Sequence, residues 1–218
     1  MTVLIFGATG AAGGSVLRAC LSAPHVKGVR TITRRPLHRN DPKLRTYVHG
    51  DYLDYSAVQD AFKNVDACFF CLGISVSQVA GEPEYRNITH NFALAAARTL
   101  KAASPEATFH YISGKGASLK GPFMWARVKA ETERDLIQLF DALAWRPASI
   151  DGEFSDNGPK LYRTLQPVLR LMRPFRGLYI KGEDLGRAML QATSENLRGR
   201  VIENAEIRDI ADRASRPG

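Results

Sequence analysis

Three glycines near the start of the chain have the spacing of a turn that binds phosphate. Gly7, Gly10 and Gly13 follow directly after the strand-like apolar run Thr2–Phe6 and open a segment with helical spacing. Glycine lets the backbone turn sharply, lets a pyrophosphate approach the main-chain amides, and lets the helix pack closely on the strand. The first turn of the helix then offers free N–H groups and the positive end of the helix dipole. The segment predicts a dinucleotide site rather than a purely structural turn, with contacts from Gly7, Thr9, Gly10, Ala11, Ala12 and Gly13.

The next strand-like run, Gly28–Thr33, ends in two arginines rather than a carboxylate. Arg34 and Arg35 follow it directly, and no acidic residue occurs before Asp41. A site that prefers NAD places an Asp or Glu here to accept a hydrogen bond from the ribose 2′-hydroxyl. Two guanidinium groups suit a 2′-phosphate instead, through forked, charge-assisted hydrogen bonds. The pair predicts NADP(H) as the cofactor, the alternative being two solvated arginines on a loop.

Apolar runs of strand length alternate with helical stretches, and this order must position the glycine turn and the arginines. Expected strands cover residues 2–6, 28–33, 44–48, 67–72, 108–113 and 142–146, and expected helices cover residues 13–21, 55–62, 84–103 and 122–140. Near-continuous apolar strands separated by helices favour parallel pairing with right-handed crossovers. The sequence predicts an α/β fold with a doubly wound, mostly parallel, Rossmann-like sheet. We expect a single NAD(P)-binding domain over residues 1–218, with a small C-terminal substrate lobe.

Composition and charge limit the classes of function. The 218 residues are 44% hydrophobic and 24% charged, as in globular proteins. No apolar run approaches the ~20 residues that span a bilayer, and residues 2–6 lack the flanks of a signal peptide, so a cytoplasmic location is predicted. The net charge of +8 favours an anionic ligand. Nucleic acid is not expected as the principal ligand, because the sequence has no helix-turn-helix, zinc-finger spacing or aromatic-basic strand motif.

The cysteines and histidines do not form a recognisable site. Cys68 and Cys71 have the C-x-x-C redox spacing, but they fall in an apolar run that is expected to be a buried strand. Residues three apart on a strand face opposite sides and lie ~10 Å apart, whereas a disulfide needs Cα atoms within ~7 Å. The five histidines lack metal-ligand spacing, so no zinc site is expected.

Further motifs resemble the atypical short-chain dehydrogenase/reductases, in particular their compact NmrA-like and Tat-interacting-protein-like group. The resemblance extends over roughly residues 1–200 and implies a Rossmann fold that binds NAD(P) and acts as an oxidoreductase. It rests on the glycine turn and on Gly50-Asp51, Cys71-Leu72-Gly73, Tyr111-Ile112-Ser113-Gly114-Lys115-Gly116, Trp145-Arg146-Pro147 and the segment 183–189.

Carried over position by position, the resemblance implies the remaining contacts of the cofactor. Asp51 would meet the adenine amino group, although it could equally cap its own turn. Ser113 would lie beside the nicotinamide, although it could also be a strand-end hydroxyl bonded to the backbone. The full set of implied contacts is Asp51, Tyr52, Leu72, Gly73, Ser113, Lys129 and Pro147.

Trp125 replaces the tyrosine that the family uses as its general acid. The family carries Tyr-x-x-x-Lys on the helix after the fifth strand, where one helical turn puts both side chains on the same face. Here Trp125 and Lys129 occupy these positions. Lys129 would hold the ribose hydroxyls, unless it is a solvated helix lysine, but the indole N–H of Trp125 does not ionise and cannot act as an acid or base. The resemblance implies Ser113, Trp125 and Lys129 at the reacting end, without the usual proton relay.

Three explanations of the missing tyrosine remain open. Tyr111, Tyr85 or water could supply the proton. The substrate could be a quinone, whose reduced oxygens are readily protonated by solvent. The chain could instead bind NADPH without turnover, as a redox sensor or regulator, with Trp125 stacking over the nicotinamide pocket. The sequence therefore predicts an NADPH-dependent reductase of a quinone or activated carbonyl, or else a catalytically silent regulatory protein with a protein partner.

Residues 148–182 are expected to form a substrate-side lobe or lid. Within this segment, residues 159–173 have the pattern of a basic amphipathic helix. The helix could cover the substrate, lie on an anionic membrane surface, dock a partner, or pack on the core with a solvated basic face; a membrane surface is not the main expectation. The tail from Ile207 to Gly218 is polar and is expected to fray or to form a homo-oligomer contact.

Overall fold

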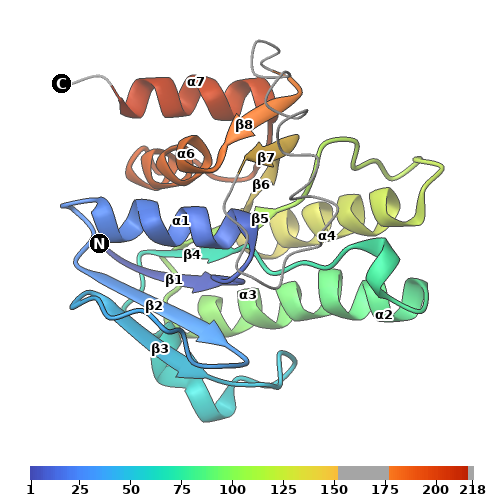
Figure 1. Ribbon diagram of the computed structural model, residues 1–218. Helices are drawn as coiled ribbons and strands as arrows, with labels where there is room; N and C mark the ends of the chain where they lie inside the picture. The colour runs from blue at the N-terminus through green and yellow to red at the C-terminus, as the bar shows by residue number, and fades with distance from the viewer. Residues whose placement is uncertain (152–176, 216–218) are drawn as a thin grey trace.

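The computed structural model describes residues 1–151 and 177–215. Its central feature is a seven-stranded parallel sheet in the order β3-β2-β1-β4-β5-β6-β9 (Figure 1). This arrangement confirms the predicted doubly wound, Rossmann-like α/β fold and adds β9, a strand that the sequence did not predict. The strands are β1 (Thr2–Phe6), β2 (Gly28–Thr33), β3 (Leu44–Val48), β4 (Ala67–Phe70), β5 (Thr108–Ile112), β6 (Leu143–Arg146) and β9 (Arg200–Glu203).

Helices cover both faces of the sheet (Figure 1). One face is covered by α1 (Ala11–Ser22) and α6 (Gly182–Ser194), with α7 (Asn204–Ala214) packed beside α6. The other face is covered by α3 (Phe92–Ala103), α4 (Met124–Phe140) and the short helix η1 (Ser56–Phe62). A further short helix, η2 (Val76–Gln78), lies in the loop after β4.

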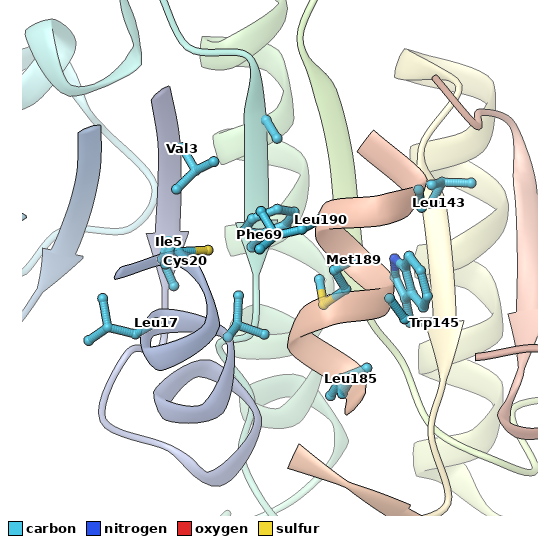
Figure 2. Close-up of a cluster of buried hydrophobic side chains, with 14 of the residues drawn as sticks. Val3, Ile5, Leu17, Cys20, Phe69, Leu143, Trp145, Leu185, Met189 and Leu190 are labelled. Carbon is cyan, nitrogen blue, oxygen red and sulfur yellow. The ribbon is translucent and has the colours of Figure 1, made fainter. Parts of the chain in front are cut away.

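The side chains of β1 explain why both faces need cover. Val3 and Ile5 point into the cluster beneath α1 and α6, whereas Leu4 and Phe6 point into the cluster beneath α3 and α4. Successive strand residues alternate between faces, so a strand that is apolar at every position must be buried on both. Figure 2 shows the first cluster, which side chains from β1, α1, β4, β6 and α6 fill.

Several predictions differ from the structure: the strand predicted over residues 67–72 ends at Phe70, and the helix predicted over residues 55–62 is a 3₁₀ helix with a kink at Val58. The helix predicted over residues 84–103 contains a π-helical turn, η3 (Asn87–Asn91), between α2 (Glu82–Arg86) and α3. The prediction of a frayed tail is wrong for residues 207–214, because α7 continues to Ala214 and buries Ile207 and Ile210 in the core; residues 216–218 lie outside the described residues, and the alternative of a homo-oligomer contact stays a prediction. The tail is polar on average because its other residues form the outer face of an amphipathic helix.

The lobe predicted for residues 148–182 is described at its two ends. There, β7 (Ser149–Asp151) and β8 (Tyr179–Lys181) pair in parallel as a small second sheet. The side chain of Asn204, at the start of α7, connects both ends: it accepts from the Ala148 N–H at 2.8 Å and donates to the Tyr179 carbonyl at 3.1 Å. The basic helix predicted over residues 159–173 lies outside the described residues.

The cysteines are buried or half-buried: Cys20 lies in α1, Cys68 lies in β4 as predicted, and Cys71 follows the last residue of β4. Cys68 lies in the cluster beneath α3 and α4, whereas Cys71 packs against the cluster on the other side of the sheet. Cys20, Cys68 and Cys71 are free thiols, and burial raises the pKa of each. Protonated thiols of Cys68 and Cys71 on opposite faces of the sheet do not form a redox pair.

His110 is a buried histidine in the centre of β5. Its Nδ1 accepts a hydrogen bond from the Trp145 indole N–H at 3.2 Å, and its Nε2 lies 3.0 Å from the Thr108 hydroxyl and 3.1 Å from the Thr193 hydroxyl. Because the indole can only donate, the neutral ring carries its proton on Nε2. Burial, with a smaller effect of the Arg198 charge, lowers the pKa of His110 to about 3.

This histidine makes the folded state sensitive to acid. The folded pKa lies below the ordinary value of 6.5, so between these values the unfolded chain binds a proton that the folded chain excludes. We expect the free energy of unfolding to fall by about 1.4 kcal/mol per pH unit as the pH drops below 6.5. Urea unfolding at several pH values measures this slope, and His110→Gln is expected to reduce it. Equal slopes for the two proteins would contradict the assignment.

Candidate cofactor and active site

The predicted site residues gather at the carboxyl edge of the parallel sheet. The strand order turns outward in both directions from the β1–β4 pair, because β2 and β3 lie on one side and β5 and β6 on the other. Ligands of such sheets bind in the crevice at this switch point. The residues that leave the strands at this edge are Gly7 after β1, Arg34 after β2, Leu72 after β4, Ser113 after β5 and Pro147 after β6.

The glycine turn is built by close backbone contacts that only glycine allows. Gly7 has a φ of +71°, and a Cβ atom there would lie 2.6 Å from the Cys71 carbonyl oxygen. A Cβ at Gly13 would lie 2.1 Å from the Gly7 carbonyl oxygen. The turn is therefore held against both the end of β4 and the start of α1, and its glycines serve close approach as well as conformation.

The N-terminus of α1 is open to an anion. Gly10 is the N-cap residue, so no side chain caps the helix, and the first turn contains no acidic residue. Thr9 and Gly10 are exposed, and Ala11 and Ala12 are half-buried. The free N–H groups and the positive end of the helix dipole are thus available to a phosphate.

Arg34 and Arg35 are exposed at the end of β2. The Thr33 hydroxyl donates to the Arg35 carbonyl at 2.7 Å and shapes this loop. Within the described part of the chain, neither guanidinium forms an ion pair with a carboxylate. The charge of Arg34 acts on Tyr52, where it opposes the burial that raises the pKa of that phenol. Two guanidinium groups without a carboxylate partner make the surface at the end of β2 strongly positive.

Asp51 shapes the loop after β3. Its Oδ1 accepts from the main-chain N–H groups of Leu53 at 2.9 Å and Asp54 at 3.3 Å, which is the turn-capping role considered as its alternative. Tyr52 is buried and stacks on Phe92, with ring centroids 5.4 Å apart. The side chain of Tyr52 is therefore part of the core.

Leu72 and Gly73 follow β4, where the loop touches the glycine turn. A Cβ on Gly7 would lie 2.8 Å from the Leu72 main-chain nitrogen, and a Cβ on Gly73 would meet no atom within 4 Å. Pro147, after β6, is buried, and its carbonyl accepts from the Lys115 N–H at 3.0 Å. These residues place main-chain atoms at the carboxyl edge of the sheet.

Ser113 and Lys129 lie together at the end of β5. The Lys129 Nζ donates to the Ser113 carbonyl at 2.7 Å and makes a longer contact of 3.4 Å with the Ile112 carbonyl. The Ser113 hydroxyl is buried and has no hydrogen-bond partner among the described residues. A buried hydroxyl without a partner needs a ligand or an ordered water.

Lys129 is half-buried, and burial lowers its pKa to about 8. The nearest opposing charge is Glu133, one turn further along α4, but both oxygens of this carboxylate bind Arg146 at 2.9 and 2.6 Å. Glu133 raises the pKa of Lys129, but burial has the larger effect. The result is an ammonium group that loses its proton close to neutral pH.

Trp125 lies one helical turn before Lys129 at the start of α4. Its ring stacks on Phe123, with centroids 6.4 Å apart and an interplanar angle of 13°. Its far edge lies against the loop at Gly116, where an added Cβ would be 3.5 Å away. Phe123 is 62% exposed and was missed from the sequence. Its position could have been noticed in the sequence, because Phe123 is an aromatic residue two positions before Trp125 at the start of the predicted helix.

The two tyrosines considered as proton sources are buried. Tyr111 and Tyr85 are each 1% exposed, and burial raises the pKa of both phenols. Tyr111 belongs to the apolar cluster beneath α3 and α4. The structure therefore places neither hydroxyl at an open site.

Comparison with known proteins adds to this geometry. A sequence model described as NAD(P)H-binding matches residues 7–135, which is more than half of the 218 residues. The matched stretch runs from the glycine turn to beyond Lys129. The chain belongs to the NAD(P)H-binding family. Within the described residues of this NAD(P)H-binding protein, no group of side chains could hold a metal ion, and no helix is long and apolar enough to cross a membrane.

Curated relatives match over nearly the whole chain. Protein FMP52, mitochondrial, of Candida albicans is 23% identical over 95% of this chain and 94% of its own length. The Saccharomyces cerevisiae protein of the same name is 27% identical over 97% of this chain and 96% of its own length. The predicted cytoplasmic location is contradicted by these relatives, which are named as mitochondrial proteins. That prediction rested on the lack of a secretory signal peptide, which does not separate the two compartments.

Solved structures share the fold of this NAD(P)H-binding protein. The dTDP-glucose 4,6-dehydratase DesIV of Streptomyces venezuelae, solved with NAD, is 17% identical with a TM-score of 0.71, over 97% of this chain and 80% of that chain. MoeE5, solved with UDP-glucuronic acid and NAD, is 17% identical with a TM-score of 0.70, over 93% of this chain and 75% of that chain. The resemblance to atypical short-chain dehydrogenase/reductases is confirmed as an NAD(P)-binding Rossmann fold.

Proposed function

We propose that this protein is an NADP(H)-dependent oxidoreductase that reduces a quinone or an activated carbonyl. The observation that carries the proposal is the pair of exposed, uncommitted guanidinium groups of Arg34 and Arg35, at the same sheet edge as the glycine turn and Lys129. An acidic residue at this corner would repel a 2′-phosphate, and two arginines attract it. When bound, NADPH supplies a hydride.

Each residue of the edge has a role in holding this cofactor. The glycine turn and the uncapped N-terminus of α1 would bind the pyrophosphate. Arg34 and Arg35 would bind the 2′-phosphate, and the loop at Asp51 and Tyr52 would border the adenine. The contacts proposed nearer the reacting end are Leu72, Gly73, Ser113, Lys129 and Pro147.

The aromatic pair at the start of α4 favours a planar substrate. Trp125 and Phe123 stack in parallel beside the loop that carries Gly116, and Phe123 is largely exposed. Aromatic faces bind flat, conjugated rings through offset stacking. A quinone fits this wall, and its reduced oxygens take protons from water more easily than an alkoxide does.

The alternative function is a silent NADPH sensor that changes its partner surface. It is favoured by the tryptophan at the family's tyrosine position and by the burial of Tyr111 and Tyr85. We place the protein in a single NAD(P)-binding domain over residues 1–218. The names of the relatives support a mitochondrial location.

The test is NADPH oxidation by the purified protein with a panel of quinones and reactive aldehydes, and with NADH as the control cofactor. We expect quinone-dependent turnover that is at least 10-fold faster with NADPH. Tight NADPH binding without turnover on the whole panel would favour the sensor. The absence of NADPH binding would contradict both functions.

A further inference from the structure

The reduction of a carbonyl needs a proton donor, and the structure limits which residues could be that donor. The indole of Trp125 does not ionise. Tyr111 and Tyr85 are each 1% exposed within the packed interior. Among the described residues near the end of β5, Lys129 is the ionisable side chain that binds the strand end, beside the unpartnered hydroxyl of Ser113. The ammonium of Lys115, in the same loop, is exposed and donates to the Gly177 carbonyl instead.

The hydrogen bonds of Lys129 position its ammonium group and leave it free to donate. The bond to the Ser113 carbonyl is short at 2.7 Å, whereas the contact with the Ile112 carbonyl, at 3.4 Å, is at the limit of a hydrogen bond. An ammonium has three N–H donors. The short bond fixes Nζ at the strand end, and the other two donors can serve a ribose hydroxyl and a substrate oxygen.

We propose that Lys129 is the proton donor of this enzyme and replaces the missing tyrosine. The inference rests on the proposed reductase function. In the step, bound NADPH would supply a hydride to the carbonyl carbon, and the C=O π electrons would move to oxygen. That oxygen takes a proton from the Lys129 ammonium, which leaves NADP⁺, the alcohol and a neutral amine. Solvent returns the proton to the amine.

The surroundings of Lys129 suit this role. The groups that face it are the ring of Tyr111 from β5, whose centroid lies 5.7 Å from Nζ, and Glu133 from its own helix, which is bound to Arg146 of β6. Burial lowers the pKa of Lys129 to about 8, within the range where a lysine can donate and regain a proton near neutral pH.

Other charged groups packed against α4 are paired elsewhere. Arg86 of α2 binds Glu131 of α4, and His90 of η3 binds Asp135 of α4. These two carboxylates lie two and six positions after Lys129, on the other side of the helix. They therefore do not set the charge of the Lys129 ammonium directly.

The first test observes the lysine itself and does not depend on turnover. NMR of the full chain with ¹³C,¹⁵N-labelled lysine follows each side chain as the pH rises. We expect one lysine signal with a midpoint near 8, absent from Lys129→Arg and retained in the control Lys120→Arg, which changes an exposed lysine of the β5–α4 loop. Titration of every lysine near the ordinary value of 10.5 would overturn the proposal.

The second test compares substrates. Arginine keeps a cation at position 129 but does not release its proton at usable pH. We expect Lys129→Arg to lower the ratio of aldehyde to quinone turnover by at least 10-fold, and Lys120→Arg to leave it unchanged. Added ammonium or ethylamine is expected to restore aldehyde turnover in Lys129→Ala.

The outcomes separate the two proposals. An equal loss on aldehyde and quinone in Lys129→Arg, with no amine rescue in Lys129→Ala, would overturn the proton-donor role and leave the reductase function standing. If none of the quinones or aldehydes supports NADPH oxidation by the wild-type protein, both the reductase function and the proton-donor role of Lys129 are overturned. NADPH fluorescence titration of each variant shows whether cofactor binding is retained, so that a loss of folding is not read as a loss of the donor.

Discussion

Replacing Arg34 and Arg35 together by alanine is expected to weaken NADPH binding by about 100-fold and to change NADH binding much less. A hydrogen bond to a charged group contributes about 1.5–3 kcal/mol. Two such bonds to the 2′-phosphate therefore contribute at least about 3 kcal/mol, and 1.4 kcal/mol corresponds to a tenfold change in affinity. NADH lacks the 2′-phosphate and does not gain from either guanidinium.

Fluorescence titration of both cofactors, in the wild type and in the double variant, measures this change. Arg39→Ala is the matched control, because Arg39 is another exposed arginine of the same basic loop but lies further from the end of β2. It is expected to alter NADPH affinity by less than about threefold, as for a distant screened charge. An equal loss of NADPH and NADH binding in the double variant would contradict the phosphate assignment. If Arg39→Ala weakens NADPH binding as much as the double variant does, the preference for NADPH over NADH results from the general positive charge of the loop.

The sheet and the candidate site residues at its carboxyl edge could be predicted from the sequence, because both depend on local patterns. The apolar run Thr2–Phe6 is buried on both faces, which is why it lacks the alternation of a half-exposed strand. Gly7 and Gly13 are required by contacts with nearby backbone. The position of Arg34 at the end of β2 follows directly from the strand boundary.

Other features could not be predicted because they depend on contacts between distant parts of the chain. Strand β9 is short and joins the sheet beside β6, and α7 buries two isoleucines through a pattern that its polar residues hide. Alternation along the strand places Tyr111 on the same side as Ser113. It does not show that α3 and α4 cover this side and bury Tyr111. The low pKa of Lys129 results from burial, which outweighs the opposing charge of Glu133, and no local spacing shows this.

Substituting Gly13 by alanine is expected to disrupt the glycine turn and to weaken binding of NADPH and NADH alike. The new Cβ would lie 2.1 Å from the Gly7 carbonyl oxygen, which also accepts a hydrogen bond from the Gly10 N–H at 2.9 Å. This neighbour is backbone, so α1 must move away from the turn. We expect a loss of stability of about 1–3 kcal/mol, typical of overpacking. We also expect a loss of affinity of about 100-fold for both cofactors, because the amides lose their alignment on the pyrophosphate.

Gly14→Ala is the matched control, since Gly14 is the next residue of the same helix. An added Cβ there would meet the Ala8 carbonyl oxygen at 3.4 Å, which is an ordinary contact. Alanine also favours a helix over glycine by about 1 kcal/mol. Thermal unfolding and cofactor titration of both variants measure the contrast. Wild-type affinity in Gly13→Ala would show that the turn does not bind the pyrophosphate. Equal losses in both variants would show a general intolerance of α1 to added methyl groups.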